Sequence, residues 1–156
     1  MFKQMRMTSR MADSERAFHI LEKGEYGILS TTGENGYSYG VPLNYVCYDG
    51  NIYFHCAKEG AKIDNINYNN KVSFCVVGAT QPAPEKFSFR YESAIVFGKC
   101  SLVNDDQAKK DILLEIIKKY SPDFIEKGKE YIERSSQHAK VIKLSIEHIT
   151  AKASNI

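Results

Sequence analysis

The chain has 156 residues, of which 43% are hydrophobic, 26% charged and 12% aromatic. This length and composition fit one folded domain over residues 1–156 and are atypical of a disordered chain. The net charge of +2 is too small to indicate a nucleic-acid partner, and no apolar run approaches the roughly 20 residues that span a bilayer. Because the first residues lack an apolar signal region and the four cysteines match no zinc spacing, we expect a cytoplasmic protein without a metal.

The predicted elements begin with one short helix and continue with strands. Asp13 is a typical N-cap and Gly24 a typical stop, so the apolar residues between them predict a helix. From residue 26 the apolar pattern has a period of two, which indicates strands. Turn signals divide this stretch into three strands, at 26–32, 37–48 and 51–57.

Further strands and helices follow in the second half of the chain. Two strands are predicted at 71–79 and 92–103, and residues 80–90 between them, which contain two prolines, are expected to form a loop. An amphipathic helix should begin after a capping box at 104–107 and end at Ser121-Pro122. A second helix should direct Phe124, Ile125, Gly128 and Ile132 inward, and 141–151 should form a last strand with one buried face.

These elements predict a mainly β, α+β fold. Six strands joined largely by tight turns favour a small antiparallel barrel, with the helices at its edges. Parallel strands are disfavoured because each parallel pair needs a long crossover connection, usually a helix, and the first strands have none.

The most distinctive stretch is FHCAKEGAKIDNI (54–66), in which a strand leads directly into a short helix. The free N–H groups and the dipole at a helix start favour an anion. Lys62, in the first turn, opposes that dipole, which a phosphate bound between the two would explain. The alternative is that Lys62 is an ordinary surface lysine.

Two more residues in the strands have open interpretations. His55 near the end of its strand is either a structural, hydrogen-bonded histidine or an acid that acts on a ligand. The other histidines lie on separate elements, so a metal site is not expected. Pro42 removes one hydrogen-bond donor from its strand, which indicates either an edge strand or a place where a planar heterocycle contacts the backbone.

Several blocks of the sequence, in order, resemble one known family. Residues 5–66, NNKVSFCVV (69–77), YESAIVFGKCSLV (91–103) and KKYSP (118–122) resemble the flavin-binding split-barrel superfamily of pyridoxamine 5′-phosphate oxidase. Within it, the chain is most similar to the nitroimidazole-resistance (Nim) branch. The resemblance implies a six-stranded split barrel and a homodimer with two FMN molecules at the subunit interface, FAD being the other possible flavin.

The resemblance also implies roles for individual residues. By position, the flavin ring is bordered by Val41, Pro42, Leu43 and Asn44, its ribityl chain by His55, Cys56 and Ala57, and its phosphate by Lys62. Tyr91, Glu92 and Ser93 approach the cofactor from the fifth strand, in this chain or from a partner subunit. His55 is the catalytic candidate. Ala61 stands where the oxidases carry an arginine, so the resemblance does not extend to oxidation of pyridoxine phosphate.

The sequence is therefore interpreted as that of a cytoplasmic, homodimeric FMN protein. We expect it to pass electrons from a reduced nicotinamide or another carrier to a small aromatic or nitro compound. The flavin carries the electron chemistry and His55 donates a proton or stabilises charge near the acceptor. The alternative is a flavin- or haem-binding module that performs no turnover.

Overall fold

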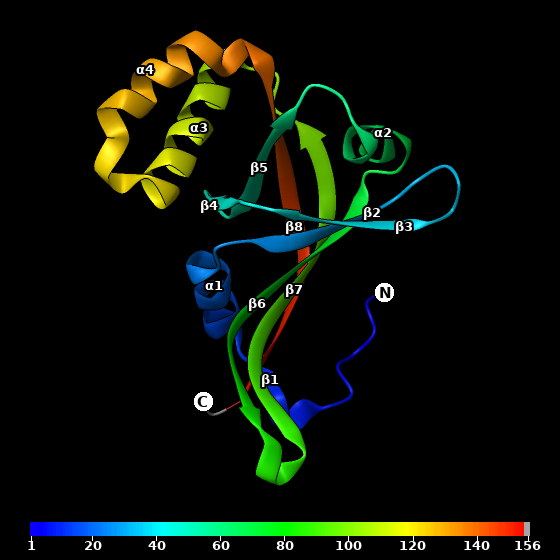
Figure 1. The fold of residues 1–156 in the computed structure, drawn as a ribbon. Helices are drawn as coiled ribbons and strands as arrows, with labels where there is room; N and C mark the ends of the chain where they lie inside the picture. Colours follow the sequence, from blue (N-terminus) through cyan, green and yellow to red (C-terminus); the bar gives the residue numbers. More distant parts are fainter. Residues whose placement is uncertain (155–156) are drawn as a thin grey trace.

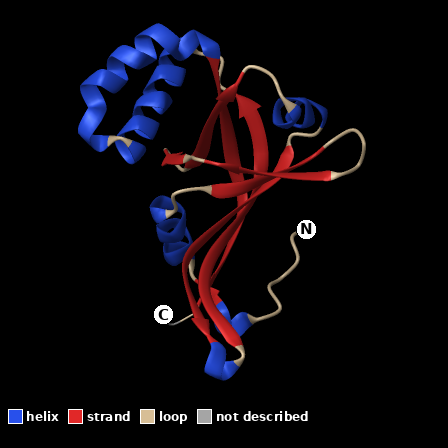
Figure 2. Cartoon of the chain, viewed as in Figure 1, coloured by secondary structure: helices blue, strands red, loops and turns tan. Residues whose placement is uncertain are grey.

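The computed structural model describes residues 1–154 and shows one long, bent sheet with helices packed outside it (Figures 1 and 2). All strand pairs are antiparallel, in the order β3-β2-β6-β7-β8-β5-β4, and β1 pairs with β8. The strands are β1 (Met11–Ala12), β2 (Gly27–Thr32), β3 (Ser38–Leu43), β4 (Val46–Tyr48), β5 (Asn51–Ala57), β6 (Lys71–Ala83), β7 (Ser88–Leu102) and β8 (Ala139–Ala153). The main helices are α1 (Ser14–Lys23), α2 (Ala61–Tyr68), α3 (Asp106–Tyr120) and α4 (Ile125–Ser135).

The predicted antiparallel barrel with flanking helices is confirmed, but residues 1–154 form eight strands rather than the expected six. One addition is the two-residue strand β1. The other arises because the predicted strand 37–48 divides at Asn44 and Tyr45. The Asn44 amide donates a hydrogen bond to the Glu25 carbonyl at 3.0 Å, and the Tyr45 N–H donates to the Tyr120 hydroxyl at 3.0 Å. These bonds tie the chain to the α1–β2 connection and to the end of α3, and they interrupt the strand.

The predicted loop at 80–90 is wrong, because β6 and β7 continue through it as a two-stranded arm. Their pairing runs from Thr80 opposite Tyr91 to Ala83 opposite Ser88, and a short 3₁₀ turn at Pro84–Lys86 closes the arm. β8 pairs with β7 only up to Glu92, so one side of each strand in the arm is free. Proline is tolerated at such an edge, which explains why Pro82 does not end the strand. The arm extends well beyond the rest of the sheet (Figure 2).

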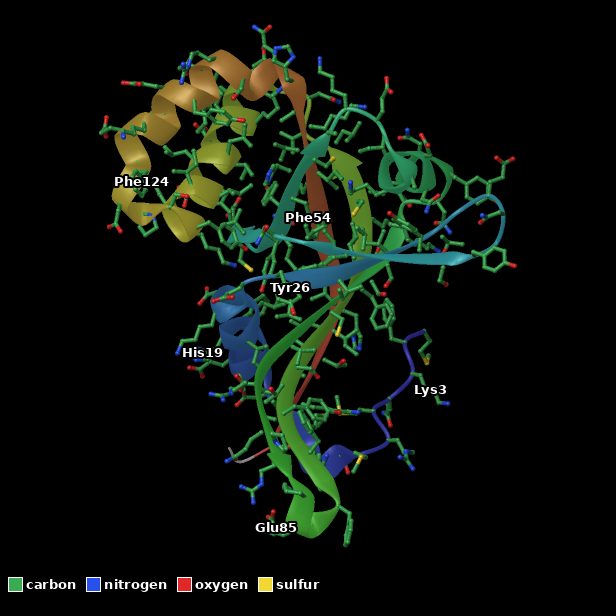
Figure 3. All side chains as sticks on the ribbon, viewed as in Figure 1. Lys3, His19, Tyr26, Phe54, Glu85 and Phe124 are labelled. Carbon is green, nitrogen blue, oxygen red and sulfur yellow. The ribbon has the colours of Figure 1, made fainter. Side chains whose placement is uncertain are left out.

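The main core fills the inside of the bent sheet, where Leu29, Phe54 and Phe74 are 0% exposed. Phe54 lies among the strands in Figure 3, whereas Phe124 lies on the outside of the α3–α4 hairpin. The prediction that Phe124 faces inward is therefore wrong, although Ile132 of the same helix is buried.

A second core lies between α3 and the outer side of β5 and β8. It contains Ile112, Ile116 and Val141. Because α3 covers this side, Val141 and its neighbour Ile142 are both buried, and the expected single buried face of the last strand is wrong at this point. The α3–α4 hairpin thus buries part of the outer surface of the barrel.

None of the helices in residues 1–154 combines the length and the apolar character that a membrane-spanning helix requires.

Candidate functional site

The junction between β5 and α2 holds four of the predicted site residues, His55, Cys56, Ala57 and Lys62. Gly60 joins the two elements with φ of 136°, a backbone conformation that only glycine adopts readily. The carbonyl of Gly60 accepts hydrogen bonds from the N–H groups of residues 63 and 64. The N–H groups at the very start of α2 have no partner within the helix, as at any helix start, so they are available to an anion.

Two lysine ammonium groups lie near this junction. Burial raises the pKa of the Cys56 thiol, and the positive charges of Lys62 and Lys140 act against that rise. Lys140 stands opposite Cys56 in the β5–β8 register, so the two side chains project from the same face of the sheet. Lys140 is not predicted from the sequence, because no local pattern links it to residues about 80 positions earlier. The arrangement offers two positive charges and free N–H donors to an anionic group.

His55 points the other way. Side chains alternate along a strand, so His55 faces α3 and α4 while Cys56 faces the main core. His55 lines a cavity of about 230 Å³, and Ile116, Tyr131 and His138 are among the other residues that line it. His55 is exposed to solvent on one side, but partial desolvation lowers its pKa below the ordinary value of 6.5, which favours the neutral imidazole at pH 7. A neutral imidazole can both donate and accept a hydrogen bond.

The predicted ring-binding residues lie on β3, which pairs only with β2 in the described chain. Val41 and Leu43 are half-buried against the main core, and Pro42 is exposed opposite Ile28. The structure thus makes the strand of Pro42 an edge strand, one of the two readings of this proline. Asn44 lies just beyond the end of β3, and its side-chain amide already bonds the Glu25 carbonyl.

Tyr91, Glu92 and Ser93 lie far from the β5–α2 junction within one chain. Ser93 pairs with Lys152 of β8, twelve residues beyond the Lys140 that pairs with Cys56. That separation corresponds to roughly 40 Å of extended strand. Glu92 is ion-paired with Arg16 of α1 at 2.5 Å. The structure therefore does not bring this trio together with the other predicted residues in a single chain.

Tyr91 and Ser93 belong to an open face of the sheet that carries exposed apolar side chains. Ile28, Val77, Ile95 and Phe97 are each more than a third exposed there, on strands that are adjacent in the sheet. The N-terminal segment crosses part of this face, where the Phe2 ring stacks on His148 at 4.6 Å between centroids.

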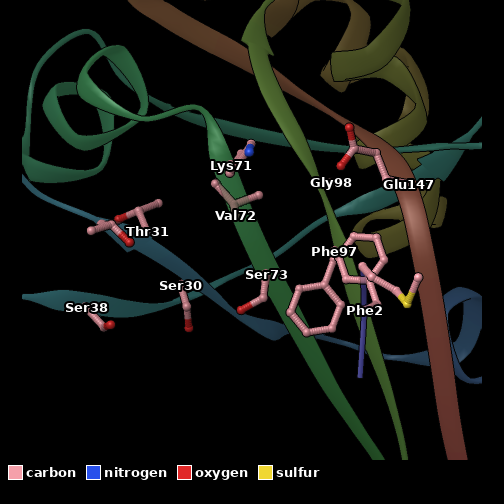
Figure 4. A pocket seen from close by; sticks show the side chains of 12 residues that line it. Phe2, Ser30, Thr31, Ser38, Lys71, Val72, Ser73, Phe97, Gly98 and Glu147 are labelled. Atoms are coloured by element: carbon pink, nitrogen blue, oxygen red, sulfur yellow. The ribbon is translucent and has the colours of Figure 1, made fainter. Parts of the chain in front are cut away.

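A pocket of about 400 Å³ opens beside Phe2 on the same face. Its walls carry the hydroxyl groups of Ser30 and Ser73 and the ring of Phe97 (Figure 4). Apolar rings and hydroxyl groups are thus presented side by side. No group of three or more metal-ligating side chains occurs within residues 1–154.

Comparison with known proteins places this geometry in a family. The family model of pyridoxamine 5′-phosphate oxidase matches residues 13–153. Among solved structures, a protein of Bacteroides thetaiotaomicron named as a proposed 5-nitroimidazole antibiotic resistance protein is 26% identical, with a TM-score of 0.79 and coverage of 91% of this chain and 85% of that one. No curated protein sequence matches the chain.

Two more distant structures share the fold. The FAD- and heme-binding protein of Mycobacterium smegmatis is 17% identical, with a TM-score of 0.81 and coverage of 94% of this chain and 74% of that one. HutZ, the heme storage protein of Vibrio cholerae, is 14% identical, with a TM-score of 0.67 and coverage of 89% and 94%. The family match spans nearly the whole chain and agrees with the observed antiparallel split barrel. The chain belongs to the pyridoxamine 5′-phosphate oxidase family.

Proposed function

We propose that this protein is an FMN-dependent reductase of small aromatic or nitro compounds. The observation that carries the proposal is the β5–α2 junction, where Lys62, Lys140 and the free N–H groups of a helix start converge. A flavin phosphate carries a charge of about −2, and these groups match it. The similarity to a protein named for 5-nitroimidazole resistance supports the choice of acceptor.

The protein residues have separate roles in this proposal. Bound FMN supplies the transfer of electrons to the acceptor. Lys62 and Lys140 hold the phosphate, and Gly60 permits the backbone turn that presents the N–H groups to it. His55, on the other face of β5, has a lowered pKa, and its neutral imidazole donates a hydrogen bond that stabilises negative charge developing on the acceptor.

The active form in this proposal is a homodimer formed through the open face. The apolar side chains exposed there are typical of a surface covered by a partner. The trio Tyr91, Glu92 and Ser93 lies roughly 40 Å along the strand from the phosphate-binding groups, which exceeds the length of FMN. These residues therefore approach a flavin only when the partner subunit binds it.

A flavin- or haem-binding module without turnover is the second candidate. It is supported by the fold shared with proteins named as FAD- and heme-binding and as heme storage. The absorbance spectrum of the purified protein separates the cofactors, because flavin absorbs near 450 nm and haem gives a Soret band. Reduction of a nitro compound by the flavin-loaded protein separates an enzyme from a binding module.

The phosphate site is tested by titrating FMN and riboflavin, which differ only in the phosphate, against wild type and Lys62→Ala. A charge-assisted hydrogen bond is worth roughly 1.5–3 kcal/mol, so wild type should prefer FMN by about 10- to 150-fold. Lys62→Ala should remove most of that preference and leave riboflavin affinity nearly unchanged.

Lys58→Ala is the matched control, because Lys58 is an exposed lysine in the bend that connects β5 to α2. It should keep the preference for FMN. If Lys62→Ala and Lys58→Ala both keep the wild-type ratio of affinities, Lys62 does not bind the phosphate and the site is wrongly placed. A protein that binds neither flavin refutes the proposed function as a whole.

A further inference from the structure

The cavity between β5 and the α3–α4 hairpin has no role in holding the flavin phosphate. It is lined by His55 of β5, which is exposed to solvent, and by residues of the two helices and the segment that follows them. Its volume is about 230 Å³, and its lining is largely apolar, with Leu113, Ile116, Ile117, Tyr131, Ile132 and Ala139 contributing hydrocarbon surface. Because Tyr131 and His138 are exposed, the cavity is open to solvent between the hairpin and the sheet.

The size of the cavity restricts what it can hold. An apolar cavity of about 150 Å³ accommodates benzene, whereas sites for drug-sized ligands occupy about 300–1,000 Å³. A volume of about 230 Å³ lies between these limits and corresponds to one ring with one or two substituents.

The polar groups of the cavity restrict the chemistry of the ligand. They are two imidazoles, His55 and His138, and the hydroxyl groups of Tyr131, Ser135 and Ser136, of which the Ser135 hydroxyl already donates to the Tyr131 carbonyl. No carboxylate of residues 1–154 lines the cavity, so a cationic ligand finds no opposite charge there. A charged ligand would lose hydration against the apolar walls without an opposite charge to replace it. A neutral ligand with one hydrogen-bonding substituent meets no such cost.

We propose that this cavity is a binding site for neutral, single-ring aromatic compounds, whose polar substituent bonds to His55. Binding at this site does not require flavin, because the site lies on the opposite face of β5 from Cys56 and the lysines. The further assignment of this cavity as the place where the electron acceptor binds rests on the proposed function.

The site is tested with 4-fluorophenol, which is neutral at pH 7 and can be followed by ¹⁹F NMR. The probe is titrated into flavin-free and FMN-loaded protein, and 4-fluorobenzylamine, which is positively charged, is titrated in parallel. Wild type should bind the phenol in both forms and the amine at least about ten-fold more weakly.

Two variants fill the cavity from different helices. Ser135→Leu on α4 and Leu113→Phe on α3 should each weaken phenol binding at least about ten-fold. Arg134→Leu is the control, because it adds the same side chain to α4 at an exposed position that does not line the cavity. It should change the affinity less than about two-fold. Using both filling variants keeps the test valid when one of them does not fold.

The results separate this proposal from the flavin proposal. Phenol binding that is lost in the filling variants supports the site, even when FMN titration shows no flavin binding. No phenol binding by wild type overturns the proposal, as does wild-type affinity in a folded filling variant. Equal affinity for the phenol and the charged amine overturns the assignment to neutral ligands.

Discussion

The Tyr120 hydroxyl joins three segments that meet where β3 passes into β4. It accepts a hydrogen bond from the Tyr45 N–H at 3.0 Å, and its proton can be donated to the carbonyl of Glu25 at 2.7 Å or of Tyr45 at 2.9 Å. Tyr45 itself is 0% exposed. Tyr120→Phe removes the hydroxyl and keeps the ring, so the Tyr45 N–H loses its partner in a place that water does not easily reach.

A buried donor left without a partner costs about 1–3 kcal/mol. Tyr120→Phe should therefore lower the free energy of unfolding by about 1–3 kcal/mol. For a domain of this size, 1 kcal/mol corresponds to about 2–4 °C, so the Tm should fall by about 2–12 °C. Urea denaturation at one fixed protein concentration measures the change, because the proposed dimer would make the stability depend on concentration.

Tyr131→Phe is the matched control, because it removes a hydroxyl from a tyrosine that is 62% exposed. Its free energy of unfolding should change by less than about 0.5 kcal/mol. If both variants unfold at the same urea concentration as wild type, the hydroxyl of Tyr120 does not hold the β3–β4 connection in place.

Four further predictions concern the proposed role of His55, the proposed dimer and the sheet. His55→Ala should keep bound FMN but reduce acceptor turnover by about 10²–10⁴-fold in a nitro-reduction assay; loss of flavin or of fold would instead indicate a structural histidine. The folded chain binds a proton at His55 less readily than the unfolded chain, in which the pKa is near 6.5. The free energy of unfolding should therefore decline as the pH falls below about 6.5. The urea midpoints at pH 7.5 and pH 5.5 should differ less in His55→Phe than in wild type. Ile95→Glu should give a 17.7 kDa monomer in sedimentation, whereas Phe124→Glu, on the far side of the molecule, should remain dimeric. Gly98→Ala places a Cβ 2.1 Å from the Ser145 carbonyl oxygen and should lower the free energy of unfolding by about 1–3 kcal/mol or more. In the control variant Gly40→Ala, the nearest atom to the new Cβ is 3.3 Å away, and the protein should unfold at a urea concentration close to that of wild type.

Local signals in the sequence predict the type and order of most of the elements. The period-two pattern predicts the bounds of β2 and of β5 to within one or two residues. The turn at Asp49-Gly50 has the positive φ angles that this pair of residues predicts. The helix beginning after Asp13 is likewise confirmed, since its side chain accepts a hydrogen bond from the Arg16 N–H. The resemblance to the family can also be recognised from the sequence, because it depends on blocks of residues that occur in a fixed order along the chain.

Only the tertiary structure decided what lies beside each strand. Lys140 reaches Cys56 through the pairing of β8 with β5, and Tyr120 interrupts a strand that is 75 residues away in sequence. The arm formed by residues 80–91 depends on a free strand edge, which no local pattern records. Alternation along β5 directs His55 and Cys56 to opposite faces, but the cavity around His55 exists because α3 and α4 pack over that face. Periodicity reports which residues share a face, whereas what covers that face is set by contacts between segments far apart in the chain.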